Sequence, residues 1–291
     1  MPEYLTTKEL AELLRIKERK VYDLAANGVV PVSKAMGKLL FPREAVYAWL
    51  ARNSSGFDLP GTNPVPNVVL GSHDPLLEWA LRESECTLAT FFDGSADGLA
   101  RFISHEGIAT GLHLYGPSGW NLDVIRERCA VMPVVLVEWA RRWRGLIIAP
   151  GLAQEVRSLA DLNKRHRLVP RQPQAGAQGL LMHCLAGHNI REEQLTWVSA
   201  ARSESDAVSM VHEAKAEVAF GLQALAGQFR LPFIPVIEER FDLLVNRRAW
   251  FEPPMQKFLT FCNSPAFAAR AAEMDGYDVS GFGTVHFNGA S

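Results

Sequence analysis

Residues 4–50 read YLTTKELAELLRIKERKVYDLAANGVVPVSKAMGKLLFPREAVYAWL, which predicts two short helices, a hairpin and a third helix. Thr6 followed by Glu9 is a capping-box pattern, so the first helix is expected to begin at Thr7. A tight break at Arg15–Ile16 separates it from a second helix, which is expected over residues 17–26. Asn27–Gly28 then ends the second helix, because either residue tolerates a left-handed backbone.

The second helix is expected to bury Val21 and Leu24 and to leave a basic face outward. Residues 29–41 are typical of a hairpin that turns at Met36–Gly37–Lys38, and Pro42 then opens the third helix. Two short helices, a basic second helix and a hairpin wing together predict a winged helix-turn-helix.

This stretch resembles the excisionase-like, MerR-related DNA-binding domains over nearly its whole length. The resemblance rests on TTKELAELL, VYDLAANG and GKLLFPREAVYAWL, in that order and spacing. It departs at Lys17, where these domains usually have a Ser or Thr N-cap, and that change should weaken the helix start by about 1 kcal/mol. The resemblance implies double-stranded operator DNA as a partner, contacted by Lys17, Arg19, Lys20, Tyr22 and Lys38. A small helical adaptor that binds another protein is the alternative.

The charges along the chain are distributed unevenly. Residues 1–53 hold nine Lys and Arg against six Asp and Glu, whereas the remainder holds 21 against 26. A basic head on an acidic body fits a head that meets nucleic acid. Composition shifts predict a head at residues 1–53, a Ser-, Gly- and Pro-rich linker at residues 54–66 and a body at residues 67–291.

The body alternates strand-like and helix-like segments, which predicts α/β layers with mostly parallel sheets. Strands are expected at residues 68–70, 87–92, 109–114, 134–139, 146–149, 167–169, 217–220, 233–236 and 241–245. Helices are expected at about residues 75–84, after Ser95, at 121–129, through Cys184 and at about 254–274.

Three polar turns stand where strands end and helices begin: Ser72, Ser95 and residues 175–177. In α/β sheets such turns direct backbone N–H groups into a ligand crevice. They are also ordinary helix-capping positions, and capping is the simpler interpretation for each one alone. They favour a small-anion site only if the fold brings them together.

Residues 67–286 resemble the periplasmic-binding-protein-like sensor domain of molybdate- or tungstate-type bacterial regulators. The matching stretches are VVLGSHDPLLEWAL, ATGLHLYGPSGWNLDVI, RGLIIAPG, RLVPRQPQAGAQGLL and LPFIPVIEERFDLLV. This resemblance implies a type 2 fold of two α/β lobes that clamp a small polar ligand, with an oxyanion as the leading class. The implied ligand-side residues are Ser72, His73, Ser95, Asn121, Arg171, Gln172, Ala175, Gly176, Ala177 and Glu239.

The third ligand-side turn departs from that family. Ala175-Gly176-Ala177-Gln178 stands where the family usually has Gly-Ser-Gly-Thr-Arg, so two hydroxyls and a guanidinium are missing. An oxyanion buried with too few donors is poorly held. The ligand therefore differs from molybdate, or binding has been lost. Ser205 and Asp206 precede or open a helix of the same lobe, and Asp206 would repel an anion or accept a hydrogen bond from a ligand.

Other side chains give weaker signals. Neither the histidines nor the four cysteines show metal-ligand spacing, so we expect neither a metal nor a cofactor. A basic aromatic cluster at residues 139–144 is expected to be a solvated strand edge. No apolar stretch is long enough for a membrane span, and together with a DNA-binding head this predicts a cytoplasmic protein.

Three classes of function remain open on the sequence. A ligand-responsive transcriptional regulator, at least a dimer, accounts for both parts of the chain. An enzyme would need a nucleophile with an oriented base, and no such motif stands out, so we expect a non-enzyme. A ligand-binding protein whose head recruits another protein is the third. The sequence leaves open the ligand, the target genes and the direction of regulation.

Overall fold

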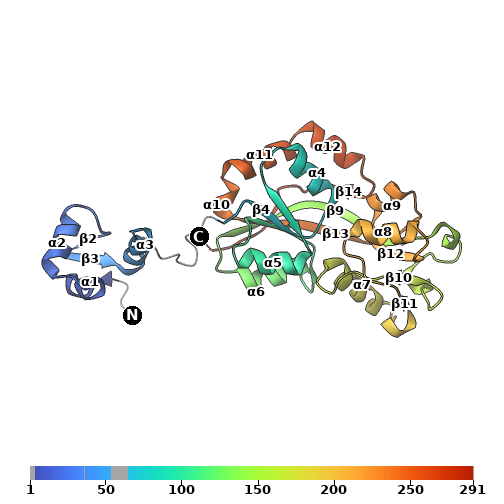
Figure 1. Cartoon of the computed structure of the whole chain (residues 1–291), viewed down its shortest axis with the longest axis horizontal. Helices are drawn as coiled ribbons and strands as arrows, with labels where there is room; N and C mark the ends of the chain where they lie inside the picture. Colours follow the sequence, from blue (N-terminus) through green and yellow to red (C-terminus); the bar gives the residue numbers. More distant parts are fainter. Residues whose placement is uncertain (1–3, 36, 54–64, 291) are drawn as a thin grey trace. The chain divides into compact units, whose positions relative to one another are not determined.

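The computed structural model describes residues 4–35, 37–53 and 65–290, and the chain divides into two compact units, residues 1–64 and 65–291. Each unit is drawn in Figure 1. The expected linker lies almost wholly outside the described residues.

The head consists of three helices and a three-stranded antiparallel sheet with the order β1-β3-β2. Its elements are β1 (Tyr4–Leu5), α1 (Thr7–Leu14), α2 (Glu18–Ala26), β2 (Ser33–Ala35), β3 (Lys38–Pro42) and α3 (Arg43–Asn53). The capping box is present, since Thr6 Oγ1 accepts from Glu9 N at 3.3 Å and Thr6 N donates to Glu9 Oε2 at 2.7 Å. Lys17 caps α2 without a side-chain hydrogen bond, as its chemistry predicts. The predicted hairpin is confirmed, since β2 pairs with β3 and Ala35 lies opposite Lys38, while Met36 itself lies outside the described residues. Strand β1 was not predicted.

The head has a hydrophobic core of its own. Leu10, Val21, Phe41 and Val46 are fully buried and pack together with other residues drawn only from positions 5–50. The predicted outward side chains of the second helix and the wing are all exposed: Lys17, Arg19, Lys20, Tyr22 and Lys38. The pattern of apolar residues therefore predicted the faces of this unit correctly.

The body is built on one ten-stranded sheet with the path β11-β10-β12-β9-β13-β6-β4-β5, and β14 and β15 add to β9. Its strands are β4 (Val68–Gly71), β5 (Ala89–Phe92), β6 (Ala109–Leu112), β9 (Val134–Ile148), β10 (Arg167–Val169), β11 (Thr196–Trp197), β12 (Val218–Leu222), β13 (Phe233–Asn246), β14 (Tyr277–Asp278) and β15 (Val285–Asn288). A separate hairpin joins β7 (Tyr115–Gly116) and β8 (Gly119–Trp120).

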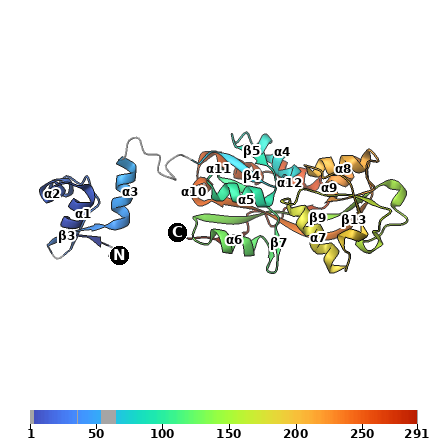
Figure 2. The same cartoon turned by 60° about the horizontal axis from the view of Figure 1, so that its bottom comes forward.

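Strands β9 and β13 pass through both lobes of the body, as Figure 2 shows. Lobe 1 contains β4, β5 and β6, and lobe 2 contains β10, β11 and β12. β9 pairs with β13 from residue 134 to residue 147, and its last part also pairs with β12 of lobe 2. The two long antiparallel strands are therefore the hinge between the lobes of a type 2 periplasmic-binding-protein-like fold.

Two expectations about this sheet were wrong. The strands predicted at 134–139 and 146–149 are one strand, β9, which ends at Ile148, and those at 233–236 and 241–245 are one strand, β13. Both strands continue because Arg142, Arg144 and Glu239 between these segments are paired inside the protein. The sheet is also mixed. Strands pair in parallel within each lobe's outer part, whereas every pair that involves β9 or β13 is antiparallel.

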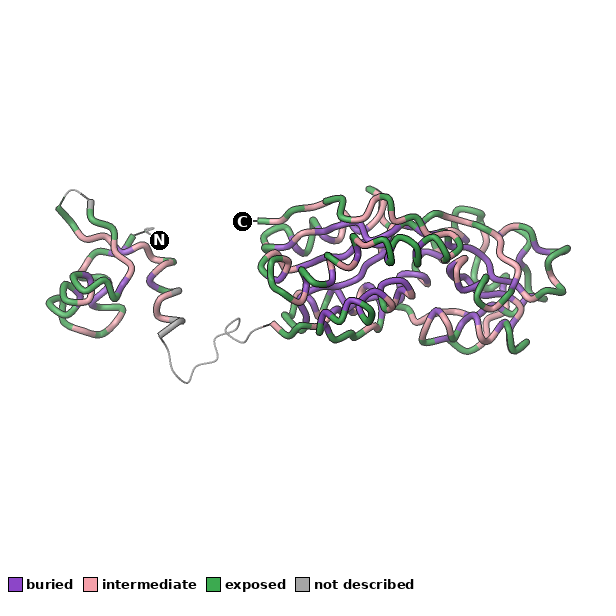
Figure 3. The backbone as a smooth tube through the Cα atoms, turned by 90° about the horizontal axis from the view of Figure 1, so that it is seen from above, coloured by how far each residue is buried: buried purple, intermediate pink, exposed green. Residues whose placement is uncertain are grey.

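Helices cover both faces of the sheet in each lobe (Figure 1). In lobe 1, α4 (Pro75–Glu83), α11 (Pro253–Cys262) and α12 (Pro265–Ala272) cover one face, and α5 (Ser95–Ile103) and α6 (Leu122–Cys129) cover the other. In lobe 2, α7 (Gly176–Gly187) packs on one face, and α8 (Glu204–His212) and α9 (Gln223–Phe229) pack on the other. A short α10 (Arg247–Trp250) follows β13. Buried backbone accordingly runs through the middle of the body (Figure 3).

Three single-turn 3-10 helices complete the body, at Pro150–Leu152, Leu159–Asp161 and Glu192–Gln194. Within the described residues, no helix has the length and apolarity that crossing a membrane requires.

Candidate functional site

A small cavity of about 40 Å³ lies between the two lobes, beside the hinge strands. Lobe 1 lines it with Ser72, His73, Phe92, Asp93, Gly94 and His113. Lobe 2 lines it with Arg171, Ala175, Ala177, Arg202, Ser203 and Glu204. The turns that follow β4, β5 and β10 therefore do converge, as the topology of an α/β sheet requires.

The lobes touch at two glycines beside this cavity. A Cβ atom on Gly94 would lie 3.1 Å from the carbonyl oxygen of Gln174 in the opposite lobe. A Cβ atom on Gly176 would lie only 2.9 Å from Cε1 of His113. Backbone from one lobe therefore reaches the other where no side chain intervenes, and the cleft is closed.

A chain of four buried polar side chains forms the lobe 1 wall. Ser95 Oγ lies 2.8 Å from Ser72 Oγ, and Ser72 Oγ lies 3.1 Å from His113 Nε2. His113 Nδ1 lies 3.0 Å from Glu239 Oε2, and the His113 backbone N donates to Ser95 Oγ at 3.1 Å. The two hydroxyls are thus tied through one imidazole to a carboxylate in the hinge.

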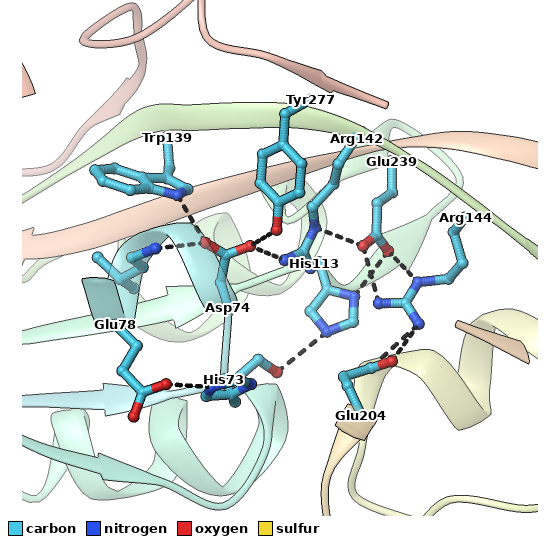
Figure 4. Close-up of polar contacts among 12 residues, drawn as sticks. His73, Asp74, Glu78, His113, Trp139, Arg142, Arg144, Glu204, Glu239 and Tyr277 are labelled. Carbon is cyan, nitrogen blue, oxygen red and sulfur yellow. Dashed lines mark hydrogen bonds and ion pairs between the residues drawn. The ribbon is translucent and has the colours of Figure 1, made fainter. Parts of the chain in front are cut away.

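Glu239 of β13 lies between two arginines of β9 (Figure 4). Arg142 Nε approaches Glu239 Oε1 to 2.7 Å, and Arg144 donates from Nε to Oε2 at 2.9 Å and from Nη2 to Oε1 at 3.0 Å. All three residues are almost completely buried. Burial alone would raise the pKa of Glu239, but the two guanidiniums hold that pKa well below its usual range.

Asp74 anchors a second part of this network in lobe 1. It caps α4 by accepting from Leu77 N at 2.7 Å, and it accepts from Trp139 Nε1 at 3.1 Å. Its other carboxylate oxygen pairs with Arg142 and accepts from the Tyr277 hydroxyl. Burial and the adjacent Asp74 raise the pKa of Tyr277 well above its ordinary value, so the phenol stays protonated.

Glu204 opens α8 and connects lobe 2 to the hinge. Its carboxylate accepts from Arg144 Nη1 at 3.0–3.1 Å, and its Oε1 lies 3.7 Å from Arg171 Nη1. Burial opposes ionisation of Glu204, but Arg144 and Arg171 outweigh it and lower the pKa of Glu204 to about 2. A negative charge is therefore part of the cavity wall.

His113 is neutral in this setting. Burial lowers the pKa of His113, and the nearby positive charges of Arg142 and Arg144 act in the same direction, against the opposing influence of Glu239. Ser72, His113 and Glu239 have the connectivity of a nucleophile, a base and an orienting carboxylate. The two guanidiniums nevertheless disfavour the imidazolium that a general base must form.

The cavity also has unused hydrogen-bond donors. Arg171 donates from Nη2 to the Arg202 carbonyl at 2.9 Å, whereas its Nε and Nη1 make no hydrogen bond. The N-caps of α5 and α7 are Gly94 and Ala175, and neither supplies a side-chain cap. Two helix N-termini and a guanidinium edge therefore present donors with partial or full positive charge.

Several predicted ligand residues occupy supporting positions. Asn121 holds the β7–β8 hairpin, accepting from Leu114 N at 2.7 Å and donating to Asp242 Oδ2 at 2.8 Å. Gln172 accepts from Ala175 N through its backbone carbonyl, 2.9 Å away. Asp206 is exposed and forms a capping box with Ser203, while Ser205 is half-buried outside the cavity lining.

The interpretation of Ser72 and Ser95 as simple helix caps was wrong. Asp74 and Gly94 occupy the N-cap positions, which leaves both hydroxyls free to bond to each other and to His113. The expectation of a solvated strand edge near Trp139 was also wrong. Arg142 and Arg144 are buried, whereas Arg141 before them and Trp143 between them face outward.

Sequence reasoning missed His113, Arg142, Arg144 and Glu204 as members of one network. Alternation along β9 was the available signal, because it places residues 142 and 144 on the same buried face. Nothing in the sequence indicated which carboxylates would meet them. Among residues 4–35, 37–53 and 65–290, no three His, Cys, Asp or Glu side chains are grouped to hold a metal.

Comparison with known families agrees with this architecture. Residues 78–263 match the PBP superfamily domain, and residues 4–54 match a helix-turn-helix domain. The uncharacterized protein YvgK of Bacillus subtilis (strain 168) is 22% identical over 299 residues, covering 96% of each chain.

Solved structures share the fold of the body at low sequence identity. A putative phosphate ABC transporter substrate-binding protein with bound phosphate from Clostridium perfringens covers 73% of this chain and 99% of its own, with a TM-score of 0.53 and 11% identity. The tungstate ABC transporter of Geobacter sulfurreducens covers 69% of this chain and 95% of its own, with a TM-score of 0.52 and 10% identity. The regulatory domain of NMB2055 (MetR), a LysR family regulator from N. meningitidis, covers 72% of this chain and 95% of its own, with a TM-score of 0.51 and 12% identity.

Proposed function

The chain belongs to the PBP superfamily, and because its head matches a helix-turn-helix domain, we propose that it is a transcriptional regulator controlled by a small ligand. The head binds double-stranded operator DNA, and the cleft of the body binds the ligand. Such a protein works in the cytoplasm. The molybdate-type and MerR-related assignments remain part of this proposal.

The observation that carries the proposal is the cavity between the lobes with its unused donors. Arg171 Nε and Nη1 lack hydrogen-bond partners, although the Arg171 side chain is only 11% exposed. Buried donors without partners cost free energy, so a ligand that supplied an acceptor here would relieve that cost. Together with the uncapped N-termini of α5 and α7, they favour a small anion, and oxyanions such as molybdate and tungstate are the first class to test.

Ligand binding acts on the lobes. A ligand that bridges Ser72 of lobe 1 and Arg171 of lobe 2 stabilises the closed cleft relative to an open one. Closure bends the body about β9 and β13 and so changes how paired heads meet the operator.

One small head offers few base contacts, so we propose at least a dimer that reads a two-part operator. Native mass spectrometry should detect the dimer, and a monomer both free and on DNA would contradict it.

The cleft binds its ligand without turning it over. His113 has a lowered pKa and faces two arginines, so it is a poor base for activating Ser72. Hydrolysis of p-nitrophenyl acetate by the wild type should match that by Ser72→Ala. A rate that depends on Ser72 would instead indicate an enzyme.

Calorimetry and DNA binding together test the regulator. The full chain is titrated with molybdate, tungstate, sulfate and phosphate, and binding to a DNA fragment selected from a random library is measured with and without each anion. We expect at least one anion to bind and to change DNA affinity, and Arg171→Ala to abolish both effects. Arg165→Ala, an exposed arginine outside the cavity lining, is the matched control. Removal of residues 1–53 should abolish DNA binding, and retained binding would refute the role of the head.

A further inference from the structure

We infer that the cleft selects a singly charged anion that keeps a hydrogen-bond donor of its own, and that it rejects fully deprotonated oxyanions. This inference rests on the proposed function of the cleft and narrows the class of its ligand. It follows from two independent features of the cavity wall, namely the direction of the hydrogen bonds through His113 and the carboxylate of Glu204.

The first feature begins at Glu239. Its carboxylate is ionised between Arg142 and Arg144, so it can only accept hydrogen bonds. The His113 nitrogen that faces it, Nδ1, must therefore carry the proton across their 3.0 Å contact. Because the imidazole is neutral, its other nitrogen, Nε2, is then an acceptor.

The direction continues through the serines. Ser72 donates its only hydroxyl proton to His113 Nε2, 3.1 Å away. Ser72 and Ser95 lie 2.8 Å apart, so Ser95 must donate its proton to Ser72 Oγ. Both hydroxyl protons are thus committed inside the wall, and Ser72, which lines the cavity, offers a ligand a lone pair only. A ligand that contacts Ser72 must donate.

The second feature is the charge of Glu204. Its side chain is 6% exposed and lines the cavity, where it remains ionised through Arg144 and Arg171. The buried charges around the cleft balance, with Arg142, Arg144 and Arg171 against Asp74, Glu204 and Glu239. Two further residues of the cavity lining, Arg202 and Asp93, are exposed and opposite in charge, so they also offset each other. The remaining attraction for an anion comes from two helix ends, each equivalent to about half a charge. That attraction suits one negative charge rather than two.

These features point to the same chemistry. The donors on Arg171, α5 and α7 take the charged acceptor side of the ligand, and Ser72 takes its donor side. Monoanionic phosphate has both sides, nitrate has the charge without a donor, and sulfate has neither the single charge nor a donor. Calorimetry on the full chain should therefore give measurable binding of phosphate below its second pKa, weaker binding above it, and little binding of nitrate or sulfate.

Glu204→Gln tests the charge. It keeps an oxygen that can accept from Arg144 but removes the negative charge, so the affinity ratio of sulfate to monoanionic phosphate should rise by at least about tenfold. Glu213→Gln removes the same charge from the exposed end of the same helix, where Glu213 pairs with Lys215, and should leave the ratio unchanged. Thermal unfolding of both variants establishes that they fold.

The tautomer of His113 tests the direction of the hydrogen bonds in the wild type itself. Nitrogen-15 NMR of histidine-labelled protein, assigned with His113→Asn, should show a protonated Nδ1 and an unprotonated Nε2. A protonated Nε2 would reverse the chain of donors and overturn the inference.

The outcomes separate this inference from the proposed function. If sulfate binds the wild type as tightly as monoanionic phosphate does, the selectivity is wrong while an anion-binding regulator stands. If no anion binds either the wild type or Glu204→Gln, the anion site itself is wrong and the selectivity falls with it. A changed ratio in Glu213→Gln would show that the effect is not specific to the cavity.

Discussion

Arg142 and Glu239 are cross-strand partners in the β9–β13 pair, with 2.7 Å between Arg142 Nε and Glu239 Oε1, where both strands pass between the lobes. Neither side chain is more than 1% exposed. The hinge thus contains ionised groups that depend on each other for compensation, and breaking such a pair is more costly than never having built it.

Glu239→Gln should destabilise the body strongly. It leaves Arg142 and Arg144 without their shared carboxylate, and loss of one partner from a buried pair costs about 3–5 kcal/mol. Urea unfolding followed by circular dichroism measures this loss. Glu238→Gln is the matched control, because Glu238 is the preceding residue on the same strand and its side chain is 44% exposed. We expect Glu238→Gln to change the free energy of unfolding by less than about 0.5 kcal/mol, and equal effects of the two changes would contradict the role of burial.

Acid should weaken the body through Glu204. The pKa of Glu204 falls from 4.5 in the unfolded chain to about 2 in the folded protein. The stabilisation from ionised Glu204 is therefore complete above the unfolded-state pKa and is lost as the pH falls through the folded-state pKa. A shift of that size corresponds to about 3 kcal/mol. The free energy of unfolding should therefore decrease between about pH 5 and pH 2, and Glu204→Gln should flatten that decrease. A slope that is identical in wild type and variant would remove Glu204 from the titration.

Gly176→Ala should prevent full closure of the cleft. The added Cβ would lie 2.9 Å from His113 Cε1, and Ser72 and Glu239 hold that imidazole in place. Overpacking of this kind costs about 1–3 kcal/mol, and small-angle scattering of a chain with this change should show a larger radius of gyration. Gly179→Ala is the control within α7, because its Cβ would meet nothing within 4 Å. That change should stabilise the helix by about 0.5–1 kcal/mol, and a similar loss in both variants would argue against the contact.

Replacing Arg19 and Lys20 with Ala should weaken DNA binding and its dependence on salt. Both side chains are exposed on α2. The slope of log affinity against log salt concentration should become shallower by about 0.9 for every phosphate that the variant no longer neutralises. Binding to the selected fragment across a salt series measures this. Lys164→Ala with Arg165→Ala removes the same charge from an exposed part of the body and should leave the slope unchanged. An unchanged slope in the head variant would exclude α2 as the DNA-contacting helix.

The head was predictable because its signals are local. The Thr6–Glu9 capping box and the break at Arg15 depend on neighbours within a few residues, and both are present. The alternation of segments in the body likewise predicted its α/β class. The sequence did not predict that β9 and β13 are each one continuous strand, because charged residues in the middle of an apolar run normally indicate a loop or a strand end.

The candidate site was predictable only in outline. The turns at Ser72, Ser95 and Ala175 converge because sheet topology requires it. The partners of Arg142 and Arg144 come from positions 74, 204 and 239, which are 60–97 residues away along the chain. A single sequence contains no signal that pairs a particular carboxylate with a particular guanidinium over such separations. The direction of the hydrogen bonds through His113 depends on those pairings and was therefore beyond reach.

The self-contained core of the head has an evolutionary consequence. Every residue described in that core comes from positions 5–50. Substitutions on the exposed face of α2 can then accumulate without disturbing the charge balance of the cleft. Substitutions in the cleft can likewise accumulate without disturbing the exposed face of α2. The head and the body can drift at different rates, and recombination between them can exchange one operator for another while the same chemical signal is kept.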